Sequence, residues 1–288
     1  MSCDRYLQRI RACHDVDFAA FEPWFVNGCA VGRVHRDRVA MLLVPGSPFV
    51  RTAGRLTLVG DNFAARSQRM AAVADRLAAS GNARPPVGEL YPVQAADAYE
   101  PFLAIDRSVV TWFGVHARGV HLNGYVVVPN GVALWIARRA RGKRTYPGHL
   151  DNMVAGGQSI GFTAMATLRK ECQEEAGIGA DLVDHAVAAG TLSYAHQDGL
   201  SLKADTLTCF DLELPHGFTP QPVDGEVETF ELWPLPVVAS SLRGDGLWKP
   251  NCALVALHFL LRQGALDGEL ASDQRHRLMR ALQGEVPA

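Results

Sequence analysis

Residues 156–178 read GGQSIGFTAMATLRKECQEEAGI, and this stretch decides how the rest of the chain is interpreted. Its centre carries Glu171, Glu174 and Glu175, which lie between a glycine-rich turn and Gly177. Side chains at positions i, i+3 and i+4 project from one face of a helix, so the spacing predicts three clustered carboxylates. Such carboxylates repel one another unless a cation lies between them, and Mg²⁺ prefers carboxylate oxygens together with water and substrate phosphates. The stretch therefore indicates metal-assisted chemistry on a phosphate or diphosphate.

The local signals around the three glutamates predict a helix over residues 164–176. Thr163 is a suitable N-cap, and Gly177 is suitable to end the helix. An apolar stripe runs beside the acidic one and is made of Met165, Leu168, Cys172 and Ala176. One face of this helix should therefore pack on a sheet, while the neighbouring face presents the carboxylates.

Two segments before this helix are candidates for substrate binding. Gly156 and Gly157 let the backbone approach a ligand closely, because they carry no side chain. A basic loop over residues 138–144 contributes Arg139, Lys143 and Arg144 as candidate anion-binding groups. The alternative for the loop, a solvated turn, stays open at this point.

The rest of the chain alternates between strand-like and helix-like segments. Residues 1–115 look like a separate unit without a recognisable catalytic set, so we predict two domains, 1–115 and 116–288. In the second unit the strand candidates are residues 120–128, 132–138, 187–194, 202–214 and 227–233, and an apolar helix follows at 251–262. Interleaved strands and helices predict an α/β fold with helices packed on a mixed sheet.

Composition excludes several functional classes. The chain has 288 residues and a formal net charge of −2, so it offers no basic field for nucleic acid. No apolar run is long enough to span a membrane. The first ten residues carry charges and no apolar core, and the six cysteines form no CxxC pair. We therefore expect no secretory signal and a cytoplasmic protein with reduced thiols; the oligomeric state is left open.

The spacing of the central stretch resembles the Nudix box, in which G, five residues, E and seven residues precede REUxEExGU, with U aliphatic. Counted from Gly156 without a gap, the matching residues are Gly156, Glu171, Glu174, Glu175, Gly177 and Ile178, with Cys172 at the first aliphatic position. Phe162 stands where the box has its first Glu, and Lys170 stands where it has Arg. Phe162 cannot bind a metal, and Lys170 keeps the charge without the bidentate fork of arginine.

A narrower resemblance covers most of the chain. Residues 119–125 (GVHLNGY), 150–157 (LDNMVAGG) and 249–253 (KPNCA), together with the N-terminal unit, look like the Nudix branch related to thiamin pyrophosphokinase. This resemblance implies a Nudix α/β/α sandwich around a mixed sheet, preceded by a smaller α+β domain. It also implies hydrolysis of thiamin diphosphate, and especially of its oxidised or damaged analogues, to the monophosphate.

The residue types then suggest roles. Glu171, Glu174 and Glu175 would hold Mg²⁺ or Mn²⁺, which neutralises a small-molecule diphosphate and activates water. The base would be Glu174 or Glu175, or else Glu226 or Glu228, which alternation places on one strand face. Two alternatives stay open: the same chemistry on a nucleoside diphosphate derivative, a dinucleotide or coenzyme A, and a non-catalytic diphosphate-binding protein with a degenerate box.

Overall fold

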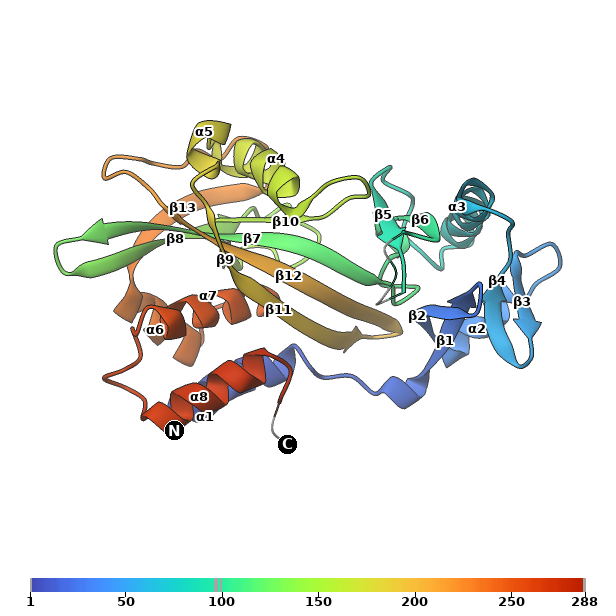
Figure 1. Ribbon diagram of the computed structural model, residues 1–288, viewed down its shortest axis with the longest axis horizontal. Helices are drawn as coiled ribbons and strands as arrows, with labels where there is room; N and C mark the ends of the chain where they lie inside the picture. The colour runs from blue at the N-terminus through green and yellow to red at the C-terminus, as the bar shows by residue number, and fades with distance from the viewer. Residues whose placement is uncertain (1, 96–97, 99, 287–288) are drawn as a thin grey trace.

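The computed structural model describes residues 2–95, 98 and 100–286, and its largest element is a seven-stranded mixed sheet (Figure 1). The central strand β7 lies between β12, which runs parallel to it, and the antiparallel strands β8 and β10. The strands of this sheet are β7 (His116–Val128), β8 (Gly131–Arg139), β9 (Leu150–Asn152), β10 (Val154–Gly157), β11 (Val187–Asp198), β12 (Ser201–Glu213) and β13 (Val227–Pro234).

Strands β9 and β10 form a wedge between β7 and β8. Strand β8 pairs with β7 only at its first residues, from Gly131 to Leu134. Farther along, β9 pairs with β8 and β10 pairs with β7. Strand β10 pairs with no strand but β7 among the described residues, so its other edge stays open. This open edge carries the glycine-rich segment that precedes the acidic helix.

Helices cover both faces of the sheet, as Figure 1 shows. Val120 and Leu122 of β7 point to the face covered by α4 (Ala164–Ala176) and α5 (Ala180–Val183). His121, between them, points to the opposite face and meets α7 (Pro250–Arg262). That second layer also contains α6 (Leu235–Arg243) and α8 (Ser272–Leu282). The predicted α/β/α sandwich is therefore confirmed.

The first helix, α1 (Ser2–Ala12), belongs to this second layer and not to the N-terminal unit. Tyr6, Leu7 and Ile10 are fully buried in the same core as the apolar face of α7. The Tyr6 hydroxyl donates a hydrogen bond to the Ala239 carbonyl of α6 at 3.4 Å. The sequence-based division at residue 115 therefore needs one correction, because an amphipathic stripe does not indicate which sheet it will cover.

The N-terminal unit has its own sheet and core. Its four-stranded sheet has the order β2-β1-β4-β3, and β5 pairs separately with β6. Its elements are η1 (Phe18–Ala20), β1 (Phe21–Val26), β2 (Cys29–His35), η2 (Arg36–Arg38), α2 (Val39–Leu42), β3 (Phe49–Thr52), β4 (Arg55–Leu58), α3 (Phe63–Ala79), β5 (Leu90–Val93), β6 (Leu103–Asp106) and η3 (Arg107–Val109). The rings of Trp24, Phe49 and Phe113 pack together in this core.

None of the described helices has the length and apolarity that crossing a bilayer requires.

The chain passes from the N-terminal unit to β7 through a tight contact at Gly114. Its φ of 54° is in the left-handed region, and a Cβ there would lie 2.2 Å from the Arg33 carbonyl oxygen. The Arg33 amide also donates to the Phe113 carbonyl at 3.0 Å. The backbone at Gly114 thus packs directly against the backbone at Arg33, and only glycine fits at position 114.

We therefore expect Gly114→Ala to lower the free energy of unfolding by more than about 1 kcal/mol, because neither the φ angle nor the Arg33 carbonyl can adjust cheaply. Urea denaturation measures the change. Gly142→Ala is the matched control, since Gly142 has open space around its α-carbon. Equal midpoints for the two variants would contradict the assigned contact.

Candidate active site

Helix α4 begins and ends where its sequence predicts. The Thr163 hydroxyl accepts a hydrogen bond from the Ala166 amide at 3.1 Å, which caps the first turn. Gly177 ends the helix with a φ of 65°, and its amide donates to the Cys172 carbonyl. Leu168 and Cys172 are fully buried against the sheet. These contacts fix the rotation of the helix and hence the directions of its three glutamates.

Glu175 points inward, to the open edge of β10. Its side chain is buried, with 8% of the residue exposed, and its Oε2 accepts a hydrogen bond from the Ala155 amide at 3.0 Å. Burial raises the pKa of Glu175 well above its ordinary value, and the nearby Asp151 and Glu171 charges add to that rise. In the described part of the chain no cation pairs with the Glu175 carboxylate within 4.0 Å, although the Lys249 charge partly lowers its pKa.

Glu171 rests directly on Gly156. A Cβ on Gly156 would lie 2.2 Å from the Glu171 Cγ, so no larger residue fits there. Burial also raises the pKa of Glu171, although Lys170 opposes the rise. The glycine at the start of the box is thus required by the packing of its first central glutamate.

Glu174 is half exposed and shares a cation with Glu171. The Lys170 ammonium lies 2.7 Å from Glu174 Oε2 and 3.2 Å from Glu171 Oε1. These bonds raise the pKa of Lys170 despite the opposing effect of burial. Lys170 therefore bridges two carboxylates with a single nitrogen, where an arginine would use its two-pronged fork.

The three helix carboxylates fit a hard divalent cation by their chemistry. Their ligand atoms are all carboxylate oxygens, the donors that Mg²⁺ and Mn²⁺ prefer. Two of them are held in the protein with raised pKa values, which a bound cation would offset. In the described part of the chain, these carboxylates do not all come within 4.8 Å of one another. The Lys170 ammonium lies between two of these carboxylates, those of Glu171 and Glu174.

Glu226 and Glu228 do not share a strand face as the alternation predicted. The pairing of β13 with β8 shifts between Val227 and Thr229, so Glu228 lies in a β-bulge. Glu226 precedes the strand and binds the Lys143 ammonium at 2.5 Å. Glu228 is near Arg141, 3.7 Å away. A bulge reverses the side-chain alternation, and it leaves no clear trace in the sequence.

The basic loop is largely paired with acidic groups. Arg139 is buried and donates to Asp151 at 2.9 Å and to the Thr145 carbonyl at 3.1 Å, so its guanidinium is committed to the fold. This pairing argues against the predicted substrate-binding role of Arg139. Arg144 is exposed and has no acidic partner within 4.0 Å in the described chain. Of the three predicted cations, Lys143 is paired with Glu226 and Arg144 is exposed to solvent.

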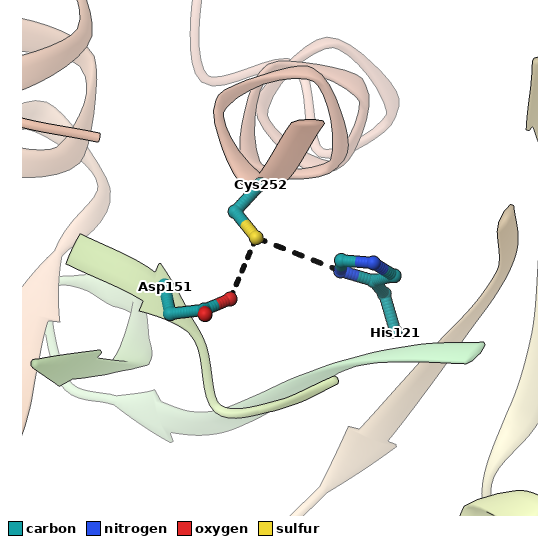
Figure 2. Close-up of side chains that lie close together, drawn as sticks. All are labelled: His121, Asp151 and Cys252. Atoms are coloured by element: carbon teal, nitrogen blue, oxygen red, sulfur yellow. Dashed lines mark hydrogen bonds between the residues drawn. The ribbon is translucent and has the colours of Figure 1, made fainter. Parts of the chain in front are cut away.

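A buried polar cluster lies on the other face of the sheet (Figure 2). The Cys252 Sγ is 2.6 Å from Asp151 Oδ1, and His121 Nδ1 is 3.9 Å from the same sulfur. The Lys249 ammonium binds Asp151 Oδ2 at 3.2 Å. His121 also contacts Asn152 Oδ1 at 2.7 Å. The three segments 119–125, 150–157 and 249–253 meet in this cluster.

His121, Asp151 and Cys252 have the donor types of a metal site, and their ligand atoms lie within 4.8 Å of one another. The bonds of Asp151 argue against one, because its Oδ1 accepts the Cys252 thiol and the Asn152 amide while its Oδ2 binds Arg139 and Lys249. Burial lowers the pKa of His121 to about 4 and raises that of the Cys252 thiol. Burial alone would raise the pKa of Asp151, but Lys249 and the other partners lower it below its ordinary value. Asp151 already holds two cations, so this cluster is a closed structural network.

Residues of the N-terminal unit also reach the site. Glu89 accepts a hydrogen bond from Ser159, in the loop that precedes α4, at 3.0 Å. Tyr91 lies over Gly157. The sequence indicated neither residue, because no motif marks them and only tertiary packing brings them here.

Three comparisons place this architecture among known proteins. Residues 5–117 match a family described as a domain of unknown function (DUF4743). Nudix hydrolase 20, chloroplastic, of Arabidopsis thaliana is 44% identical over 181 residues, which are 63% of this chain and 48% of that protein. Nudix hydrolase 24, chloroplastic, of the same plant is 35% identical over 271 residues, which are 93% of this chain and 72% of that protein. The chain thus spans about half the length of the first relative.

Among solved structures, the NUDIX domain of Shewanella oneidensis NrtR complexed with ADP ribose aligns with a TM-score of 0.42 at 12% identity. The alignment covers 52% of this chain and 90% of that domain.

The buried cluster predicts a large stability effect. Asp151→Asn leaves Lys249 and Arg139 buried without a counter-charge, so we expect the free energy of unfolding to fall by about 3–5 kcal/mol. Urea denaturation measures it. Asp184→Asn is the matched control, because Asp184 pairs with Arg169 on the surface and should cost at most about 1 kcal/mol. Comparable losses in both variants would show that the Asp151 network does not stabilise the fold.

Proposed function

The chain belongs to the Nudix hydrolase family, and from that premise we propose that it is a metal-dependent hydrolase of diphosphate bonds. The observation that carries this proposal is the pair of helix carboxylates beside β10, the buried Glu175 and the partly buried Glu171, whose pKa values burial raises. Carboxylates removed from water destabilise a fold unless a cation offsets their charge, and Glu171 shares the single charge of Lys170 with Glu174. A binding protein with a degenerate box would have no use for them, whereas a metal-dependent enzyme needs them charged.

The residues that would hold Mg²⁺ or Mn²⁺ are Glu171, Glu174 and Glu175. A bound metal supplies charge neutralisation for the diphosphate and a more acidic water. Lys170 must then release at least one of its two carboxylates. Its side chain is half exposed and flexible, so it can move to solvent or to a substrate phosphate.

Glu226 is the better placed of the two carboxylates near β13 to accept the proton of the attacking water. It directly precedes β13, and its carbonyl accepts a hydrogen bond from the Ala140 amide at 2.9 Å. Burial would raise its pKa, but the bond to Lys143 lowers it below its ordinary value, so Glu226 is ionised at neutral pH. Glu174 and Glu175 stay open as alternative bases, because either could act from the helix side.

We propose thiamin diphosphate, or an oxidised or damaged analogue, as the substrate. The support is the resemblance carried by residues 119–125, 150–157 and 249–253, which the fold gathers into one cluster. Of these segments, residues 150–157 also carry the glycine-rich edge that Glu171 and Glu175 contact.

The proposal is tested by phosphate release with Mg²⁺ across a panel of thiamin diphosphate, its oxidised analogue, ADP-ribose, NADH and coenzyme A. Loss of a metal ligand removes several kcal/mol of transition-state stabilisation, so Glu174→Gln should lower turnover by about a hundredfold or more. Glu285→Gln, an exposed control just after α8, should leave turnover unchanged. Metal-dependent turnover of ADP-ribose alone would refute the thiamin assignment, and no turnover of any diphosphate would refute the enzyme.

The bulge in β13 separates the roles of its two acids. We expect Glu226→Gln to lower kcat by about a hundredfold, because it removes a proton acceptor beside the site. Glu228→Gln should stay within about twofold, because Glu228 is displaced by the bulge and bound to the exposed Arg141. Steady-state kinetics with the preferred substrate measures both variants. The reverse order of effects would assign the role to Glu228.

A further inference from the structure

One short segment of the N-terminal unit, residues 89–91, lies against the loop that leads into α4. The Glu89 carboxylate accepts a hydrogen bond from the Ser159 hydroxyl at 3.0 Å. The Leu90 carbonyl accepts one from the Ile160 amide at 2.8 Å. Side-chain and backbone bonds together give this segment a fixed position beside the candidate active site.

Tyr91 directs its hydroxyl at the glycine-rich segment. A Cβ on Gly157 would lie 1.5 Å from the Tyr91 hydroxyl, so the hydroxyl fills the space that a side chain would take. Neighbouring residues of a strand project to opposite faces, so Glu171 on Gly156 and Tyr91 on Gly157 lie on either side of β10. Glu175 lies along the open edge between them. A ligand at that edge can therefore meet groups from both faces.

The Tyr91 hydroxyl has no hydrogen-bond partner in the described part of the chain, although only 6% of the residue is exposed. The Tyr91 oxygen is not one of the fully buried unpaired side-chain atoms of the described chain, so it keeps some contact with solvent. Burial raises the pKa of Tyr91, and the Glu89 and Glu171 charges act in the same direction. The hydroxyl is therefore protonated and free to donate a hydrogen bond.

Arg107 is a cation of the N-terminal unit whose charge acts on Tyr91. Its backbone amide donates to the Glu89 carbonyl at 2.8 Å, and its guanidinium donates to the Glu89 carboxylate at 2.7 Å. Its side chain is 57% exposed, which leaves the remaining N–H groups available. Its charge also helps Lys143 to lower the pKa of Glu226, so Arg107 acts across the open edge.

In residues 116–288, most cations of the basic loop are already paired. Arg139 is held by Asp151, Arg141 is near Glu228, and Lys143 is bound to Glu226, which leaves Arg144 without an acidic partner among the described residues. A diphosphate presents several anionic oxygens, which need donors beyond those that a metal provides. Tyr91 and Arg107 are positioned to supply them.

We infer that the N-terminal unit completes the diphosphate site, with the Tyr91 hydroxyl and the Arg107 guanidinium binding the phosphate oxygens of the substrate. This inference rests on the proposed function, since it names residues of the same site. It gives the N-terminal unit a direct role in substrate binding, in place of a purely structural one.

The test measures binding without turnover. Imidodiphosphate, whose bridging nitrogen resists hydrolysis, is titrated into the full chain with Mg²⁺ by calorimetry. Tyr91→Phe keeps the ring and removes only the hydroxyl, so we expect about tenfold weaker binding with an unchanged melting temperature. Tyr6→Phe is the control: it removes a hydroxyl bonded to the Ala239 carbonyl, and it should lower the melting temperature while binding stays the same.

Arg107→Gln should also weaken imidodiphosphate binding by about tenfold, because a charge-assisted bond is lost. Arg84→Gln, an exposed cation of the same unit, should not. Binding within twofold of wild type for both Tyr91→Phe and Arg107→Gln overturns the inference, as does a wild-type protein that does not bind imidodiphosphate. If the variants bind weakly but wild type hydrolyses no diphosphate, the inference stands and the proposed function fails. If wild type hydrolyses a diphosphate but both variants bind imidodiphosphate as tightly as wild type does, the proposed function stands and the inference fails.

Discussion

The buried carboxylate of Asp151 is the interaction on which the site depends. A charge removed from water must be paired, and Asp151 is paired with Arg139 of β8, Lys249 at the start of α7 and the Cys252 thiol. These bonds hold β9 at one position between the two halves of the sheet. Strand β10 follows after one residue, so the same bonds fix the edge on which the glutamates of α4 rest.

Side chains of the candidate site contact strand β10 on both faces and along its open edge. On the α4 side Glu171 packs on Gly156, and at the open edge Glu175 accepts a hydrogen bond from the Ala155 amide. On the opposite side the Tyr91 hydroxyl covers Gly157. Two adjacent glycines therefore contact two side chains from different units, and a Cβ at either position would displace one of them.

Sequence reasoning succeeded where the signal is local. The limits of α4 follow from Thr163 and Gly177, and the mixed sheet follows from the alternation of segments. It failed where a contact depends on distant chain segments. Lys249 and Asp151 are 98 residues apart, and α1 meets α6 at a separation of 233 residues. The bulge at Glu228 is also invisible, because alternation predicts a regular strand. Only the folded sheet brings such residues together.

The departure at Phe162 is consistent with the presence of the N-terminal unit. Phe162 is 44% exposed and lines a cavity of about 180 Å³. Its loop contributes Gln158, Ser159 and Ile160 to this cavity, and the N-terminal unit contributes Pro92, Gln94 and Pro101. The acid that contacts this loop instead comes from outside the box, since Glu89 binds Ser159. The altered box and the additional unit are therefore parts of one arrangement, in which the neighbouring unit supplies the polar groups at this boundary.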